Sequence, residues 1–153
     1  MNWHAAGWAA AITVAVGVAL RSMPFAKVVL WSPMTGRVLT NGRPAAGATL
    51  QRDFLWHFRN EKGSDRTIAD ANGAFSLPAI ERASLLAWLL PHEPVIRQVM
   101  TVLFEGQSHN AWACFKHSYE NNGEREGRPI DVIVHLERER SEHGEVMGLC
   151  EFP

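Results

Sequence analysis

From Lys27 onward the chain is divided into short runs of apolar or alternating residues, each followed by glycine, proline or asparagine. Such runs are typical of strands joined by tight turns, because side chains two positions apart lie on one face of a strand. The strand-like runs lie at 27–32, within 36–58, and at 66–68, 75–77, 95–106, 109–119, 130–139 and 145–152. About seven or eight strands of this kind predict an all-β fold, an antiparallel β-sandwich.

The sequence "RTIADANGAFSLPAI" contains a turn signal at its centre. Asp70 and Asn72 have side chains that can hydrogen-bond to nearby backbone amides, and Gly73 accepts a positive φ without steric cost. Phe75 and Leu77 are two positions apart and therefore share one face of a strand. The pattern predicts a β-hairpin across this segment.

Two other local patterns are as clear. The residues "EGQS" separate the runs at 95–106 and 109–119, and a glycine in so short a connection predicts a second hairpin. Leucines recur with helical spacing near 84–90 and the pattern ends at Pro91, which predicts one short helix.

The segments "GRVLTNGRPAAGATL" (36–50) and "TIADANGAFSL" (67–77) resemble the opening of the carboxypeptidase-regulatory-like, or transthyretin-like, β-sandwiches. In that superfamily a strand G-x-V leads to a turn G-x-P-x-x-G-A and later to T-D-x-x-G-x-F-x-L. The matching residues are Gly36, Val38, Gly42, Pro44, Gly47, Ala48, Thr67, Asp70, Gly73, Phe75 and Leu77. The resemblance implies a transthyretin-like (prealbumin-like) sandwich over residues 27–153.

More narrowly, "SPMTGRVLTNGRP", "LLPHEPVIRQ" and "HGEVMGLCEF" resemble an uncharacterised family of small bacterial proteins that often carry a signal sequence. This resemblance covers most of residues 30–152. It implies an envelope location and brings no known active site.

Residues 5–20 form an uncharged apolar run within the N-terminal segment 1–26. The run is short for a membrane helix, which needs about 20 residues, and slightly long for a signal-peptide core. Three interpretations stay open: a cleaved signal peptide, an uncleaved anchor, or a true start at Met23 that leaves a cytoplasmic protein. Arg21 and Lys27 follow the run, which slightly disfavours export of the following chain. The apolar run still favours a periplasmic or membrane-anchored domain facing the periplasm, with membrane contact through the run itself.

The formal net charge of −1 gives no electrostatic support for nucleic-acid binding, since nucleic-acid binders usually show a basic patch. The charge is uneven along the chain, with +5 over residues 1–52 and −6 over residues 53–153. The five basic residues of the first part are spread out, as on a solvated face. No nucleic-acid partner is predicted.

No motif supplies a nucleophile or a metal site. The serines lack a G-x-S-x-G elbow, and the histidines never fall in an H-x-x-x-H arrangement. His109 and His117 share one strand face but would lie about 27 Å apart. The "DANG" turn has strands on both sides, whereas the calcium loop that it resembles joins two helices. The sequence predicts no catalytic residue, no metal ligand and no cofactor.

An enzyme assembled across strand ends is the alternative. It would use His92 and Glu93 of "PHEP" with His57 or His117, as a small hydrolase or a metal-dependent enzyme. The transthyretin-like folds include the hydroxyisourate hydrolases, whose family ends in Y-R-G-S. This chain ends in C-E-F-P, and the departure argues against that activity.

Cys114 and Cys150 are the two cysteines of the chain. In an oxidising compartment they would form one disulfide that closes a loop of about 36 residues. Two buried free thiols are the alternative.

The aromatic run "FLWHF" places apolar residues on both faces of its strand. Phe54, Trp56 and Phe58 are predicted either to fill the core or to form an exposed patch that binds a partner. The leading hypothesis is a non-catalytic binding module of the cell envelope for a protein partner, for example an immunity-type protein that neutralises a toxin. A structural domain of an envelope assembly is the alternative among non-catalytic functions.

Overall fold

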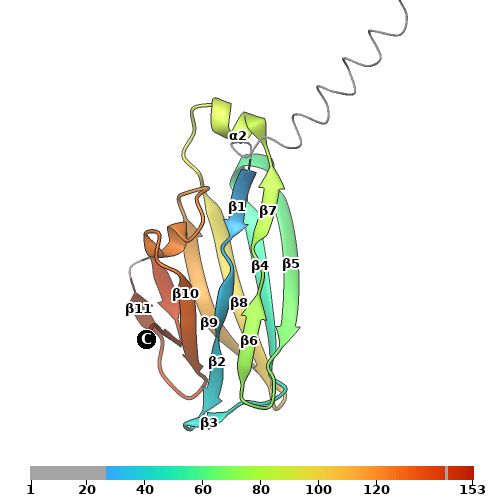
Figure 1. Ribbon diagram of the computed structural model, residues 1–153, viewed down its shortest axis with the longest axis vertical. Helices are drawn as coiled ribbons and strands as arrows, with labels where there is room; N and C mark the ends of the chain where they lie inside the picture. Colours follow the sequence, from blue (N-terminus) through green and yellow to red (C-terminus); the bar gives the residue numbers. More distant parts are fainter. Residues whose placement is uncertain (1–26, 144) are drawn as a thin grey trace, which may run out of the picture.

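The computed structural model describes residues 27–143 and 145–153, and nearly all regular structure in them is strand (Figure 1). The strands are β1 (Lys27–Trp31), β2 (Met34–Thr40), β3 (Arg43–Pro44), β4 (Thr49–Trp56), β5 (Glu61–Ile68), β6 (Ala74–Leu77), β7 (Ile80–Ala83), β8 (Ile96–Phe104), β9 (Gln107–Lys116), β10 (Ile130–His135), β11 (Ser141–His143), β12 (Val146–Gly148) and β13 (Cys150–Glu151). The helix α2 spans Leu85–Leu89, and 3-10 turns lie at His57–Arg59 (η2) and Gly123–Arg125 (η3). The predicted all-β fold with a short helix is confirmed.

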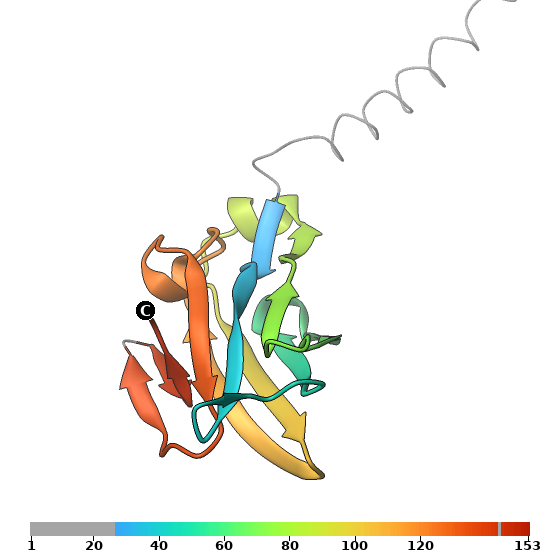
Figure 2. The same ribbon diagram turned by 60° about the horizontal axis from the view of Figure 1, so that its bottom comes forward.

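The strands form two layers around one apolar core (Figures 1 and 2). One layer is a six-stranded sheet in the order β11-β12-β9-β8-β4-β5. The other contains the pair β1-β7 and the sheet β13-β10-β2-β3, in which β6 also pairs with β2. β1 continues into β2 through a short connection that contains Pro33. β6 continues into β7 through a similar connection that contains Pro78. Proline has no amide hydrogen, so both strands lose their regular ladder at these points.

One strand pair departs from the antiparallel prediction. β10 pairs with β2 in parallel, from Ile130 opposite Met34 to His135 opposite Leu39. The other pairings between the described strands are antiparallel. The alternation of a strand shows which face is buried but carries no information on the direction of its neighbour.

The turn predicted in "DANG" is present, but the segment is not a hairpin. The Asp70 carboxylate accepts hydrogen bonds from the backbone N–H groups of Asn72 and Ala74, at 2.8 and 2.9 Å. However, β5 before the turn pairs with β4 in the six-stranded sheet, whereas β6 after it pairs with β2 in the opposite layer. The segment therefore crosses between the layers. Turn residues fix the local reversal and leave open which sheet each flanking strand joins.

The predicted hairpin of 95–106 and 109–119 is confirmed as β8 and β9. Its two connecting residues, Glu105 and Gly106, have positive φ values of 50° and 76°. Positive φ at both central residues is what a two-residue type I′ turn requires, because its twist matches that of the strands.

Inward-facing residues of both layers fill the core. The largest are the fully buried tryptophans Trp31, Trp56 and Trp112. β4 shows the alternation clearly, since every second residue of this strand, from Leu50 to Trp56, is buried. Period-two patterning therefore decides the inner face of the sheet.

The predicted signal peptide or anchor, residues 1–26, lies outside the described residues. Among the residues that the structure describes, no helix has the length and apolar character needed to cross a membrane. The described chain enters the sandwich at Lys27, at the end that carries α2 (Figure 1). The indole N–H of Trp88 on α2 donates to the Lys27 carbonyl at 3.0 Å, so this entry point and the helix are in contact.

Candidate binding surfaces

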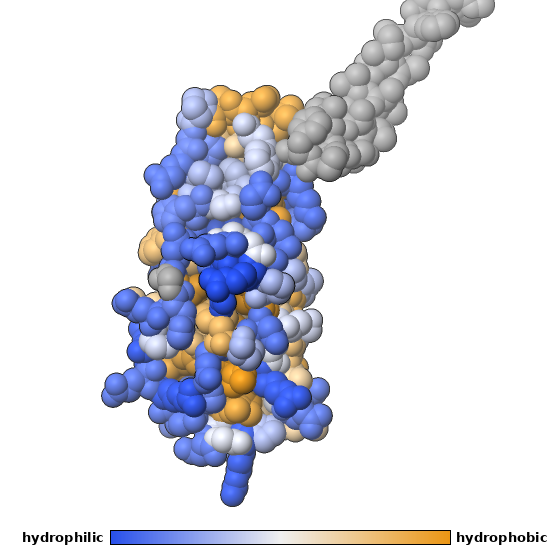
Figure 3. Space-filling model, turned by 60° about the vertical axis from the view of Figure 1, so that its left-hand side comes forward, coloured by the Kyte–Doolittle hydropathy of each residue, from blue (hydrophilic) through white to orange (hydrophobic). Residues whose placement is uncertain are grey.

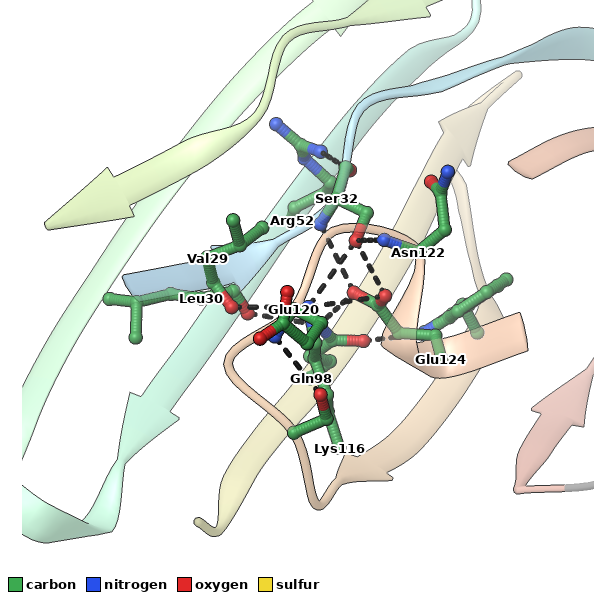
Figure 4. Close-up of polar contacts among 11 residues, drawn as sticks. Val29, Leu30, Ser32, Arg52, Gln98, Lys116, Glu120, Asn122 and Glu124 are labelled. Carbon is green, nitrogen blue, oxygen red and sulfur yellow. Dashed lines mark hydrogen bonds and ion pairs between the residues drawn. The ribbon is translucent and has the colours of Figure 1, made fainter. Parts of the chain in front are cut away.

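A cluster of polar side chains lies inside the core along the edge of β1 that faces away from β7 (Figure 4). Glu124 accepts hydrogen bonds from the Ser32 backbone N–H at 3.1 Å, the Ser32 hydroxyl at 2.6 Å and the Gln98 amide at 2.7 Å. The Lys116 ammonium lies 3.3 Å from Glu124 Oε2 and donates to the Val29 carbonyl at 3.1 Å. These side chains satisfy backbone groups that a neighbouring strand would otherwise bind.

The Lys116 ammonium donates to the Ser32 hydroxyl at 3.3 Å. In some enzymes a serine and a neighbouring basic side chain act as nucleophile and general base. Here the hydroxyl already donates to Glu124 and accepts from Lys116 and from the backbone N–H of Asn122 at 2.7 Å. Both Ser32 and Lys116 are fully buried, so a substrate cannot reach the oxygen. The cluster is structural.

The charges of this cluster are held as an ion pair. Burial alone raises the pKa of the Glu124 carboxyl, but Lys116 and the hydrogen bonds from Ser32 and Gln98 outweigh burial, and the net pKa is lowered. Burial lowers the pKa of Lys116, and the Glu124 carboxylate opposes that shift. Removal of either partner would leave an uncompensated charge in the core.

Arg52 is a second fully buried cation, at the level where both strands of the opposite layer are interrupted. Its guanidinium donates to the Ser32 carbonyl at 3.3 Å and the Pro78 carbonyl at 2.6 Å. It also binds the Asp65 carboxylate, at 2.9 and 2.6 Å, and lies 5.2 Å from the Trp31 ring centre. Arg52 thus supplies donors that the interrupted ladder lacks.

These buried polar residues were missed by reasoning from sequence, although a signal exists. Gln98 is in phase with Ile96 and Met100, and Lys116 is in phase with Cys114. A polar residue at a core position needs a buried hydrogen-bonding partner, so such positions predict an internal network.

The predicted aromatic binding strand is corrected by the structure. Phe54 and Trp56 lie on the inner face of β4 and are buried, so they do not present an exposed patch. Phe58 is half-buried in η2 and stacks on His92, with ring centres 4.3 Å apart. The core interpretation of Phe54 and Trp56 is the one that the structure supports.

The predicted disulfide is not formed, because Cys114 and Cys150 are free, buried thiols. Cys114 belongs to β9 of the six-stranded sheet and Cys150 to β13 of the opposite layer. The Cys150 thiol donates to the Ala111 carbonyl at 3.1 Å. Burial raises the pKa of both thiols to about 12, and for Cys114 the nearby Glu124 carboxylate adds to the effect.

The residues of the alternative enzyme form separate contacts. Glu93 Oε1 lies 3.2 Å from His117 Nδ1 on the surface. His92 contacts the Leu90 carbonyl through Nδ1 at 2.9 Å and the Tyr119 hydroxyl through Nε2 at 2.7 Å. A carbonyl can only accept, so Nδ1 carries a hydrogen in this contact.

His57, the remaining residue of that alternative, is exposed in η2. Within the described ranges 27–143 and 145–153, no three histidine, cysteine, aspartate or glutamate side chains are grouped so that they could hold a metal ion.

The exposed large apolar side chains fall into two groups. Four of them, here called the tip, belong to α2 and the residue after it: Leu86, Trp88, Leu89 and Leu90. Figure 3 shows an apolar cap at this end of the molecule. The other four lie on the outer face of the six-stranded sheet, here called the sheet face: Ile68, Leu103, Phe115 and Met147. On the sheet face, Ile68 and Leu103 both lie opposite Thr49, whereas Phe115 lies opposite Arg97, six residues away along β8, so the four side chains form two separate pairs. Grouped apolar side chains mark contact surfaces, whereas single scattered ones do not.

One end of the sheet face is apolar around a single arginine, at the start of β8 and the ends of β4 and β9. Arg97 lies directly between Leu55 and Phe115 across β4, β8 and β9, and Met147 lies beside Ala113. Phe115 and Met147 keep 52% and 43% of their surface exposed. Direct cross-strand neighbours share a face, so these side chains form one continuous surface.

The sheet face carries charges of both signs, with three basic side chains and the carboxylates of Asp53 and of Glu142, which lies directly opposite Met147. Among the residues that the structure describes, its cations Lys62, Arg66 and Arg97 form no ion pair. Asp53 on the same face accepts hydrogen bonds from Gln51 at 3.1 and 3.2 Å. A hollow of about 440 Å³ lies here, lined by Asp53, Phe54, Leu55, Lys62, Gly63, Ser64, Arg97 and Val99. The face therefore combines exposed apolar area with cations that are free to bind an anion.

No curated protein and no solved structure matches the chain. A family profile described as "Domain of unknown function (DUF6795)" matches residues 34–139. The match runs from β2 past the end of β10 and includes the whole tip and most of the sheet face. Because it covers well over half of the sequence, the chain belongs to this family, the domain of unknown function DUF6795.

Proposed function

We propose that the chain is a non-catalytic binding module of the cell envelope that holds an acidic protein partner on the sheet face. One observation carries the proposal: Phe115 and Met147 share an open face with three basic residues that form no ion pair within the described ranges 27–143 and 145–153. The basic residues favour carboxylates on the partner, and the apolar side chains provide the area to be buried.

Phe115 and Arg97 are the expected anchors of the complex. Burial of the half of the Phe115 surface that is still exposed would contribute about 1–1.5 kcal/mol. Arg97 is its direct cross-strand neighbour, and its planar guanidinium can bind a carboxylate through two parallel hydrogen bonds. The adjacent hollow is wide enough to receive a side chain of the partner.

The envelope location rests on the apolar run at residues 5–20, either as part of a signal peptide or as an anchor facing the periplasm. The resemblance to carboxypeptidase-regulatory-like sandwiches supports a scaffold role, because the proposed site lies on a sheet surface and needs no catalytic group. An immunity-type protein and a structural domain of an envelope assembly are two forms of this function. The identity of the captured partner distinguishes them.

The test is capture from a detergent extract of the envelope with a tagged full chain. The double variant Phe115→Ser, Arg97→Glu should retain at least about tenfold less of the partner than wild type. A matched control, Leu89→Ser, Arg128→Glu, makes the same changes in polarity and charge away from the sheet face and should retain it normally. Retention should fall as salt is raised, because the attraction is electrostatic. Equal retention by wild type and both variants would exclude the sheet face as the site.

A further inference from the structure

The tip is an unusual place for exposed apolar area. Leu86 and Leu89 keep 61% and 66% of their surface exposed, on a helix of only five residues. Trp88 and Leu90 add to the same surface. Exposure of four such side chains to water at one end of a small sandwich costs free energy, unless a partner or a lipid surface covers them.

The tip is held firmly on the sandwich. Ser84 caps α2 by accepting a hydrogen bond from the Ala87 backbone N–H at 3.3 Å, and Ala87 is buried. Trp88 donates to the Lys27 carbonyl and packs edge-on against Tyr119, with ring centres 6.0 Å apart. The exposed leucines are therefore presented outward by a fixed helix.

We propose that the tip rests on the lipid surface of the envelope membrane, beside the apolar run at residues 5–20. This inference rests on the envelope location proposed above, in the form in which the run at residues 5–20 is retained as an anchor, and names the surface that the domain touches there. The strands run along the long axis away from the tip, so the domain stands upright on the membrane (Figure 1). The sheet face then points sideways, where a protein partner can reach it.

The position of the chain entry favours lipid as the occupant. The described chain begins at Lys27, whose carbonyl accepts a hydrogen bond from Trp88 of the tip. Only residues 21–26 separate Lys27 from the apolar run, and six residues span at most about 21 Å. Contact of the run with a membrane therefore brings the tip close to the same membrane.

The residue types agree with that position. Tryptophan is enriched at the boundary between lipid and water, where its ring is buried and its N–H keeps a polar partner. Arg21 lies in the sequence between the apolar run and the sandwich, where a basic residue can attract anionic headgroups, whereas Lys27 is paired with Glu81 at 2.6 Å.

The experiment places an environment-sensitive fluorophore on the full chain in the Leu89→Cys variant. The matched control is the Leu103→Cys variant, because Leu103 is an exposed leucine at the opposite end of the strands. Cys114 and Cys150 are buried, so the introduced thiol is the reactive one. Each labelled chain is mixed with vesicles of phosphatidylcholine, alone or with phosphatidylglycerol, and quenched by lipids that carry a spin label in their acyl chains.

We expect the emission at position 89 to shift to the blue on vesicles and to be quenched several-fold more than at position 103. Equal quenching at both positions, or none at position 89 while the chain floats with the vesicles, would overturn the inference and leave the proposed function standing. A blue shift without vesicles that grows with protein concentration would assign the tip to a second copy and overturn it as well. A chain that does not float with vesicles would overturn the inference and the anchored form of the envelope location, and would leave an exported, cleaved form of the proposed function standing.

Discussion

Arg52 and Asp65 lie directly opposite each other on β4 and β5 and form a two-point ion pair, with N···O distances of 2.9 and 2.6 Å. The pair fixes the guanidinium on the inner face of the six-stranded sheet. From there it reaches the carbonyls of Ser32 and Pro78 in the opposite layer. One side chain thereby joins the two layers at the point where both strands of the second layer are interrupted.

Replacement of this arginine should destabilise the fold. Arg52→Met keeps the side-chain length but leaves two carbonyls and Asp65 without their donor, and should lower the free energy of unfolding by about 3–5 kcal/mol. Urea denaturation measures the change. Arg66→Met, an exposed position on β5, is the control and should stay within about 0.5 kcal/mol of wild type. Similar values for the two variants would show that the buried contacts contribute little.

The buried ion pair of Lys116 and Glu124 makes a second stability prediction. Glu124→Gln leaves the Lys116 ammonium uncompensated in the core and should cost about 3–5 kcal/mol in thermal or urea unfolding. Glu126→Gln, two residues away and exposed, is the matched control and should have little effect. A Glu124→Gln variant as stable as wild type would contradict the pairing.

The same carboxylate predicts a pH dependence. The pKa of Glu124 in the folded state lies below its ordinary value of 4.5. The group therefore contributes stability that is fully present above pH 4.5 and is lost as the pH falls through the lower folded-state pKa. Unfolding of wild type should depend more steeply on pH below 4.5 than unfolding of Glu124→Gln. Parallel acid profiles of the two proteins would argue against a lowered pKa.

The two cysteines should not react with thiol reagents in the native protein. With the pKa of Cys114 and Cys150 raised to about 12, roughly one thiol in ten thousand is ionised at pH 8. A thiol reagent should modify neither residue in native buffer and both in denaturant, without prior reduction. The Leu89→Cys variant should react at once and serves as the positive control. A chain that needs reduction before it can be alkylated would show a disulfide.

Two glycines with the same backbone conformation should respond differently to alanine. Gly42 and Gly73 have φ values of 74° and 71°. A Cβ at position 73 would lie 2.5 Å from the Val38 carbonyl oxygen, whereas a Cβ at position 42 would have no described atom within 4 Å apart from those of its chain neighbours. Gly42→Ala should cost about 1 kcal/mol of unfolding free energy from backbone strain alone, and Gly73→Ala about 3 kcal/mol. Equal costs would mean that the layer crossing adjusts around the added methyl group.

Much of the fold could be predicted because strand alternation and turn chemistry are local properties. The phase of β4 and the hairpin of β8 and β9 follow from residues close together in sequence. The crossing after β5 and the parallel pair of β2 with β10 depend on contacts between distant segments, which no local pattern contains.

The candidate surfaces were harder to predict for the same reason. "FLWHF" shows that apolar residues occupy both faces of a strand, but Phe54 and Trp56 become core residues only because β1 and its neighbours cover that face. Phe115 looks like any strand aromatic in the sequence. Its exposure follows from the order of six strands, whose outer side stays uncovered in the described structure.

The parallel pair of β2 and β10 also bears on how the chain folds as it is synthesised. The two strands meet residues 96 positions apart, as do Thr35 and Asp131, whose side chains hydrogen-bond across the pair. Contacts this distant in sequence form slowly, because a long loop must close before they stabilise anything. β2 can pair with β3 and β6 early, but its other edge stays open until β10 has left the ribosome. The edge of β2 therefore stays unpaired at least until translation has passed residue 135, and the second layer is completed only after β13, at Cys150–Glu151, has also been made.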